Sequence, residues 1–186
     1  MEITKKNKFV EFLKRYWAYL SVAVVVLVVA ITVGVLAGGQ SVPTTTPKLE
    51  FSLPMNEASI VKDFSSTELQ ENETLNQWEA HLSVDFASEN ADVFAVLDGT
   101  VSNVSYDILN GYTVEITHAG GFVSQYASLA EEPAVSEGDT VTSGQKIGAA
   151  GNSASFESHL DNHLHFTLML NDEPVDPNNY LDLQNK

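Results

Sequence analysis

The chain has 186 residues, a formal net charge of −16 and no cysteine. The lack of cysteine excludes disulfide bonds, a thiolate nucleophile and a cysteine-type zinc finger. From residue 38 onward, four lysines and no arginine accompany 23 acidic residues, and such a negative field disfavours nucleic acid and anionic lipid as partners. The acidic surface fits a basic protein partner, and it equally fits a solvated surface that only keeps the domain soluble.

The N-terminal segment predicts a membrane anchor. Residues 17–37 contain no charged side chain and are rich in valine, isoleucine and leucine, as expected for a transmembrane helix, which needs about 20 apolar residues. Basic residues are concentrated in residues 1–16, so we expect this tail to be cytoplasmic and the C-terminal portion to lie outside. A cleaved signal peptide ending at Val35-Leu36-Ala37 is the alternative, although the apolar run exceeds the usual length of about 7–15 residues.

The segment that follows indicates a tethered domain. Residues 38–48 contain glycine, threonine and proline and predict a short linker to an extracytoplasmic domain over residues 49–186. Residues 49–64 indicate extended segments around Pro54, and the polar, acidic stretch 65–77 predicts a loop or a short helix.

Beyond Ala80 the sequence predicts short strands separated by turns that contain glycine, asparagine or aspartate. The predicted strands cover residues 93–97, 99–106, 112–118, 122–126, 140–141, 146–150 and 163–170. No alternation of strands with helical segments is visible, so we expect a mainly β, antiparallel domain.

Two histidine-containing segments alternate polar and apolar residues. In a strand, alternate side chains share a face, which places one set on a wet face: His81, Ser83 and Asp85 in the first segment, and His163, His165 and Thr167 in the second. The opposite faces carry Leu82, Val84 and Phe86, and Leu164, Phe166 and Leu168.

Side by side, two such strands would supply two imidazoles and a carboxylate, a ligand set that Zn²⁺ accepts in an open site. We therefore expect His81, Asp85 and one histidine of the pair to bind a metal ion. The alternative is an ordinary hydrogen-bonded pair, because His81 and Asp85 are also spaced as neighbours on a helix.

Residues 80–181 resemble the M23 peptidase, or LytM, family of zinc endopeptidases that cut peptide cross-bridges in bacterial cell walls. The pattern His81-x-x-x-Asp85 is similar to the first metal motif of that family, and His163-x-His165 is similar to the second. The turns and the ending of the domain match as well, at Asp98-Gly99-Thr100-Val101, Asn110-Gly111, Gly138-Asp139, Gly144-Gln145-Lys146-Ile147-Gly148 and Val175-Asp176-Pro177. The resemblance implies an antiparallel β LytM-like fold of the duplicated hybrid motif type.

The resemblance also assigns roles. It implies that His81, Asp85 and His165 bind Zn²⁺ and that His163 is one of two catalytic histidines. The second catalytic histidine is expected in Tyr126-Ala127-Ser128-Leu129, where Ser128 occupies its position. A hydroxyl cannot replace an imidazole as an acid–base group near neutral pH, and such a loss costs on the order of 10² to 10⁴ in rate, so His163 is expected to be vestigial.

Two further departures from the family pattern also indicate a loss of catalytic activity. Thr167 stands where a glutamate commonly follows the phenylalanine, and residues 152–162 lack glycines that active members often contain. His118 and His159 are expected to be a polar residue at the end of a strand and a loop surface residue, with His159 also a candidate for the surroundings of the metal.

The order of tail, membrane span, linker and incomplete LytM-like domain resembles the sporulation group of this family. This resemblance implies a protein in the forespore membrane, with its domain in the intermembrane space, that binds a stage III sporulation protein AH-like membrane protein of the mother cell. We therefore expect a zinc-binding interaction module that bridges two membranes during engulfment and helps form a channel. The alternatives are an active zinc endopeptidase acting on peptidoglycan, with His159, His118 or a water in place of the missing group, and an activator of a cell-wall amidase.

Overall fold

The computed structural model describes residues 10–12, 14–17, 19, 21–28, 49–131 and 133–183. The chain divides into two compact units, residues 1–48 and 49–186. The described residues between 10 and 28 are helical, and among the described parts of the chain no helix is both long and apolar enough to cross a membrane. The predicted span 17–37 lies partly, and the linker 38–48 wholly, outside the described residues.

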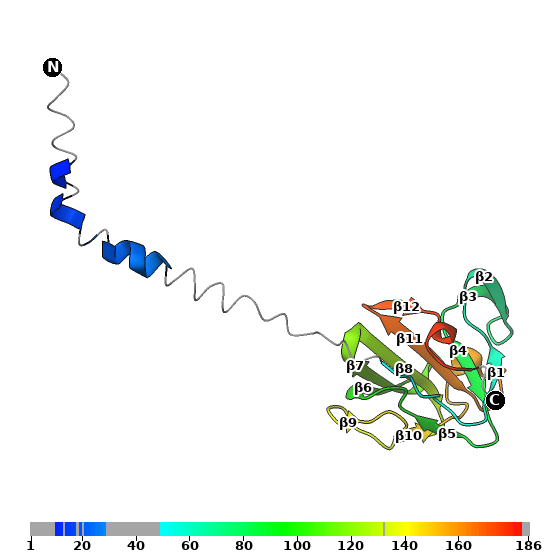
Figure 1. Cartoon of the computed structure of the whole chain (residues 1–186). Coiled ribbons are helices and arrows are strands. Elements are labelled where there is room, and N and C mark those ends of the chain that lie inside the picture. The colour runs from blue at the N-terminus through cyan, green and yellow to red at the C-terminus, as the bar shows by residue number, and fades with distance from the viewer. Residues whose placement is uncertain are drawn as a thin grey trace. The chain divides into compact units, whose positions relative to one another are not determined.

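The second unit is built from strands and contains short 3₁₀ turns in place of α-helices among its described residues (Figure 1). The strands are β1 (Ser59–Lys62), β2 (Ser65–Asn72), β3 (Gln77–His81), β4 (Val84–Ala87), β5 (Asp92–Phe94), β6 (Gly99–Asp107), β7 (Gly111–His118), β8 (Phe122–Leu129), β9 (Thr140–Val141), β10 (Lys146–Ala149), β11 (Leu164–Leu170) and β12 (Glu173–Val175). The 3₁₀ turns are η1 (Ala119–Gly121), η2 (Ser155–Glu157) and η3 (Pro177–Asn179).

One antiparallel sheet dominates the domain, with the strand order β1-β4-β11-β8-β7-β6-β9 and β12 paired to β11. Two smaller antiparallel pairs, β5–β10 and β2–β3, complete it. The expected mainly β, antiparallel architecture is therefore confirmed. The predicted strands are present, with β5 shortened at its C-terminal end and β8 lengthened.

The hydrophobic core combines side chains from the large sheet and from β5 and β10. The alternation predicted for residues 163–170 is observed, because Leu164, Phe166 and Leu168 of β11 are fully buried in this core. Val84 and Phe86 of β4 pack in the same cluster. The apolar face of β4 and β11 thus fixes the orientation of their opposite, polar face.

Two expectations are wrong. Residues 65–77 do not form a helix or an irregular loop: residues 65–72 are strand β2, which pairs with β3 in a hairpin. Most side chains of β2 are exposed, so this strand lacks the apolar alternation by which a strand is found in a sequence.

The second error concerns Leu82, which is 40% exposed and does not join the core. Residues 81–86 are not one strand, because β3 ends at His81 and β4 begins at Val84. The chain changes direction between them, so the face alternation holds within β4 and does not extend back to Leu82.

Candidate metal centre

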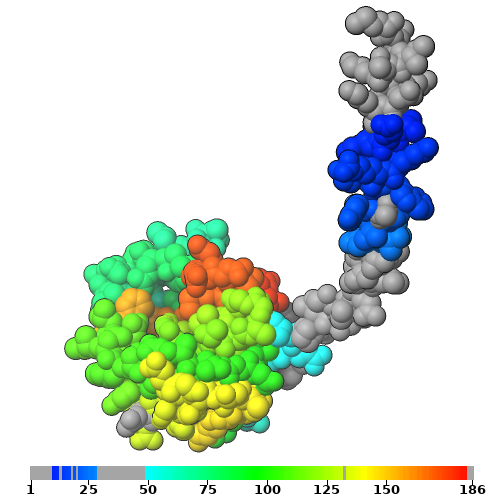
Figure 2. Space-filling view, turned by 90° about the vertical axis from the view of Figure 1, so that its left-hand side faces the viewer, coloured from blue at the N-terminus to red at the C-terminus, as the bar shows by residue number. Residues whose placement is uncertain are grey.

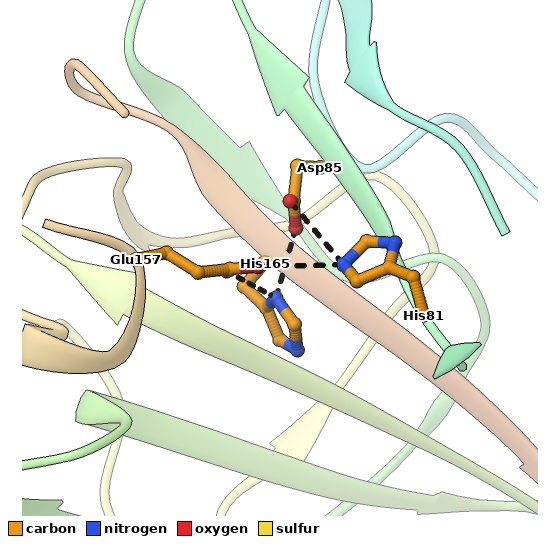
Figure 3. Close-up of side chains that lie close together, drawn as sticks. All are labelled: His81, Asp85, Glu157 and His165. Carbon is orange, nitrogen blue, oxygen red and sulfur yellow. Dashed lines mark hydrogen bonds and ion pairs between the residues drawn. The ribbon is translucent and has the colours of Figure 1, made fainter. Parts of the chain in front are cut away.

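Four side chains from four elements of the domain meet above the polar face of β4 and β11. His81 ends β3, Asp85 lies in β4, His165 lies in β11 and Glu157 ends the 3₁₀ turn η2. One ligand atom from each lies within 4.8 Å of the others. Figure 3 shows the group, with Glu157 reaching in from the side opposite His81.

The close placement of Asp85 and His165 follows from strand pairing. In the antiparallel register of β4 and β11, His165 lies directly opposite Asp85, and opposite residues on one face of a sheet are neighbours. His165 Nδ1 lies 2.8 Å from Asp85 Oδ1, and His81 Nε2 lies 3.3 Å from Asp85 Oδ2. The structure therefore brings together the three residues predicted to bind the metal.

The separations of the ligand atoms suit a zinc ion. Tetrahedral zinc with bonds of about 2.0–2.1 Å separates its ligand atoms by about 3.3 Å. The imidazole–carboxylate contacts of the group are 2.8 to 3.5 Å long, and one ligand atom from each of the four residues lies within 4.8 Å of the others. The side chains would have to draw together where their ligand atoms are farther apart than in a zinc site.

Buried polar atoms without hydrogen-bond partners also indicate that the centre can hold a metal ion. Among the described residues, both carboxylate oxygens of Asp85 and Nε2 of His163 are buried without a hydrogen-bond partner. The contact between Asp85 and His165 is short but not aligned as a hydrogen bond, and such orphaned polar atoms are costly unless another group satisfies them. A divalent cation would satisfy the Asp85 oxygens, so the residues present fit a metal ion.

Hydrogen bonds to backbone oxygens also fix the tautomers of two imidazoles, so that one ring nitrogen of each faces the metal centre. His81 Nδ1 lies 3.0 Å from the backbone oxygen of Asp63, and His163 Nδ1 lies 2.8 Å from that of Asp161. A carbonyl oxygen only accepts, so each Nδ1–H donates and leaves Nε2 directed at the site. Such outer hydrogen bonds orient metal-binding histidines in many proteins.

Ser128 does not take over the role of the catalytic histidine that is expected at its position. Ser128 is fully buried and has a φ of +60°, a left-handed conformation that is uncommon for residues other than glycine. Its hydroxyl donates to the backbone oxygen of Gly151 at 3.2 Å, and Gly151 forms a bridge with His163. Ser128 therefore supports the backbone beside His163 and carries no group that could exchange a proton near neutral pH.

The two other histidines lie apart from this centre. His118 is buried, and its Nε2 lies 2.7 Å from Ser124 Oγ in a separate network that includes the hydroxyl of Tyr126. It is more buried than a residue at the end of a strand is expected to be, and burial lowers its pKa. The His159 side chain is 63% exposed and pairs with Glu73, as expected for a loop surface residue.

Sequence reasoning missed Glu157. In residues 152–162 the sequence pattern draws attention to the lack of glycine and to His159, yet this loop places a 2% exposed carboxylate in the centre. Glu157 lies in an irregular segment without periodicity, so no spacing rule connects it to the histidines. A single acidic residue in a polar loop gives no signal of its own.

Burial and close charges shift the pKa values of the group in opposite directions. Burial alone would lower the pKa values of His81 and His165, but the close Asp85 and Glu157 carboxylates raise them to about 9 and about 10. Burial would raise the pKa values of Asp85 and Glu157, but the neighbouring imidazoles lower both. Without metal, the centre is therefore a cluster of carboxylates and imidazolium ions.

A first prediction concerns the pH dependence of the metal-free chain. The protonated forms of His81 and His165 stabilise the fold fully below their ordinary pKa of 6.5, and this contribution is lost as the pH rises through about 9 and 10. The contribution of Asp85 and Glu157 is present above their ordinary values of 3.8 and 4.5 and is lost as the pH falls toward their lower folded values.

We therefore expect the urea midpoint of the chain in chelator to be highest at about pH 5 to 6.5 and to decline up to pH 10. With excess zinc the alkaline decline should shrink, because bound metal keeps the imidazoles deprotonated. A midpoint in chelator that is constant from pH 6 to 10 would contradict the prediction.

The β fold and the His81, Asp85 and His165 arrangement together define a class of protein. The model of Peptidase family M23 matches residues 79–177, which is more than half of the chain. The chain belongs to this peptidase family, as the resemblance in the sequence predicted.

A relative within this family is similar to much of the chain. Stage II sporulation protein Q of Bacillus subtilis (strain 168) is 33% identical over 134 residues, which cover 67% of this chain and 47% of the relative. The chain thus spans about half the length of that protein. The predicted resemblance to the sporulation group of the family is confirmed by this match.

Two solved structures show the same fold. A chain described as part of the SpoIIQ–SpoIIIAH pore-forming complex has a TM-score of 0.64 and 29% identity, covering 72% of this chain and 92% of that chain. A zinc-containing peptidase from Vibrio cholerae has a TM-score of 0.54 and 29% identity, covering 63% of this chain and 35% of that chain. The family therefore includes both an assembly protein and a zinc peptidase at similar distance from this sequence.

Proposed function

We propose that this chain is a membrane-anchored, zinc-binding interaction module of sporulation that has lost effective peptidase activity. It would sit in the forespore membrane, bind a SpoIIIAH-like protein anchored in the mother-cell membrane, and help form a channel between the two membranes. His81, Asp85 and His165 would hold the zinc ion, and His163 would remain from the ancestral reaction centre.

One observation supports this proposal most strongly. The side chains proposed to bind the metal lie close together. Ser128, however, occupies the position of an acid–base group that hydrolysis requires. The residues that hold a metal are thus retained while the residues that use it are incomplete. Such a pattern fits a metal that stabilises a binding surface, because an ion that binds only the folded state adds stability.

The likeness to a chain of the SpoIIQ–SpoIIIAH complex supports the choice of partner. The match covers 92% of that chain, so it extends over nearly the whole structured part of the protein seen in that assembly. The acidic character of the domain fits a partner with a basic surface, which would speed association at low salt.

A second prediction follows for partner binding. The full chain, solubilised in detergent and immobilised, is expected to retain the extracytoplasmic domain of the SpoIIIAH-like protein from the same organism. Binding should weaken as salt rises from 50 to about 500 mM, because screening shortens the reach of the acidic field. A detergent-solubilised membrane protein of similar charge serves as the control, and failure to retain the partner even at the lowest salt concentration would count against the proposal.

The second candidate function is an active zinc endopeptidase that acts on peptidoglycan. The observation in its favour is the intact set of His81, Asp85 and His165 together with the similarity to a zinc-containing peptidase. The discriminating residue is Ser128. An activator of a cell-wall amidase shares the same architecture, and addition of the chain to a purified amidase would distinguish it.

A further inference from the structure

Glu157 occupies the side of the metal centre that the other ligands leave open. Its carboxylate lies 2.8 Å from His165 Nδ1, 3.4 Å from His163 Nε2 and 3.5 Å from His81 Nε2. It is thus in contact with every imidazole of the centre, including the vestigial catalytic histidine. Any molecule approaching the metal from this side would meet the Glu157 carboxylate first.

The loop that carries Glu157 is held from the β6–β7 hairpin. The backbone nitrogens of Ser155 and Phe156 donate to the backbone oxygens of Ile108 and Leu109, at 3.0 and 3.2 Å. Ser153 Oγ accepts from the backbone nitrogen of Tyr112 at 3.1 Å.

The fit between this hairpin and the loop is close. A Cβ at Gly111, which has a φ of +70°, would lie 2.0 Å from Ser153 Oγ and 2.7 Å from the Ser153 backbone carbon. The hairpin can therefore approach the loop only with glycine at this position.

The β2–β3 hairpin holds the loop from its other side. The side-chain amide of Asn72, itself 2% exposed, donates to the backbone oxygen of Phe156 at 3.2 Å. The backbone nitrogen of His159 donates to Thr74 Oγ1 at 2.9 Å. Lys62 Nζ donates to Glu157 Oε1 at 3.4 Å, so one carboxylate oxygen has a fixed cationic neighbour.

The surface beside this loop is hollowed. A cleft of about 360 Å³ lies between the β2–β3 hairpin and the loop, and its lining includes Lys62, Glu157 and His159. Figure 2 shows the hollow beside the teal hairpin and the orange part of the chain. Glu157 lines this cleft, whereas His81, Asp85 and His165 do not, so its carboxylate is the member of the group that borders the cleft.

We propose that Glu157 is a fourth protein ligand that closes the metal centre and makes it structural. Structural zinc sites have four protein ligands, whereas catalytic sites have three and keep one position for water or substrate. With neutral His81 and His165, the carboxylates of Asp85 and Glu157 balance the charge of a divalent ion, which suits a buried site. This inference rests on the proposal that the centre binds metal, and it explains how the ligands can be retained without hydrolysis.

The test uses the full chain loaded with Co²⁺, whose visible spectrum reports coordination, and azide as a small anionic probe. In the wild-type chain, azide is expected to leave the spectrum unchanged, because no position is open. In Glu157→Ala it should shift the spectrum with saturation, because the lost ligand leaves an accessible position. The wild-type measurement needs no variant and remains decisive even if a variant fails to fold.

Metal affinity provides a second measurement. Glu157→Gln is expected to weaken Co²⁺ binding at least tenfold, since loss of even an outer partner of a ligand costs about 10–100-fold. Glu137→Gln, which alters an exposed carboxylate in a distant turn, should bind Co²⁺ like the parent. Circular dichroism and gel filtration establish that each variant is folded before it is compared.

The outcomes separate the two proposals. A wild-type chain that takes up Co²⁺ but whose spectrum shifts with azide would overturn the closed site and leave metal binding intact. Unchanged affinity in Glu157→Gln would overturn it as well. A wild-type chain that takes up no Co²⁺ or Zn²⁺ would overturn both the closed site and the zinc-binding part of the proposed function.

Discussion

Replacing His165 by alanine is expected to lower the stability of the domain by about 3–5 kcal/mol, the usual cost of breaking a buried ion pair. The reason is that His165 faces both Asp85 Oδ1 and Glu157 Oε2 at 2.8 Å. Its loss leaves two buried carboxylates with one imidazole fewer and removes a proposed metal ligand. For a domain of this size, the melting temperature should fall by about 10 °C or more.

The comparison with chelator makes this prediction specific for metal. In the zinc-loaded parent, chelator should lower the melting temperature, because a ligand that binds only the folded state stabilises it by about 2.7–4.1 kcal/mol at 100 to 1,000 times its dissociation constant. In His165→Ala, chelator should have little further effect. Binding of the SpoIIIAH-like partner should weaken in parallel if the metal supports the binding surface.

His159→Ala is the matched control. His159 lies on the same side of the domain, but its side chain is 63% exposed and its ion pair with Glu73 is equally exposed, so its removal is expected to cost at most about 1 kcal/mol. If His165→Ala melts at the temperature of the parent, with and without chelator, a structural metal at this centre is refuted.

Zinc-loaded wild-type chain is expected to release no peptides from purified cell wall. Ser128 removes one acid–base group, which alone costs on the order of 10² to 10⁴ in rate. If Glu157 also closes the centre, a substrate carbonyl has no position beside the metal. The release of soluble peptides, measured by chromatography against wall without protein, checks this expectation.

Ser128→His alone is expected to give little or no activity, because Glu157 would remain in the centre. The left-handed backbone at residue 128 is one that histidine adopts more readily than most residues, so the substitution is compatible with the local conformation. The double variant Ser128→His with Glu157→Ala should release peptides at least about tenfold faster than either single variant, toward the 10² to 10⁴ that a positioned acid–base group supplies.

A third change controls for contaminating hydrolases. His163→Ala in the double variant should abolish the release, because the family resemblance implies that His163 is the remaining catalytic histidine. If the wild-type chain releases peptides and His163→Ala abolishes that release, the chain is an active endopeptidase and the second candidate function is correct. If Ser128→His alone is fully active, the missing histidine is the sole defect and Glu157 does not obstruct the centre.

The sequence alone was sufficient for the family, the β architecture and three residues that the structure brings together at the candidate metal centre. His81, Asp85, His163 and His165 stand in strands or at their ends, where a period of two and short motif spacings leave a readable pattern. The same regularity made the core residues of β11 predictable, because Leu164, Phe166 and Leu168 alternate with polar neighbours. Ser128 was recognised because a tyrosine and a leucine mark its place.

The tertiary structure decided the rest of the centre. Strand pairing determines that His165 faces Asp85, and the break after His81 determines that Leu82 is exposed. Glu157 reaches the centre because backbone hydrogen bonds to the β6–β7 hairpin and the Asn72 amide fix an irregular loop. Those contacts join residues far apart in the chain and leave no periodicity in the sequence, so the second carboxylate of the centre became visible only in the folded domain.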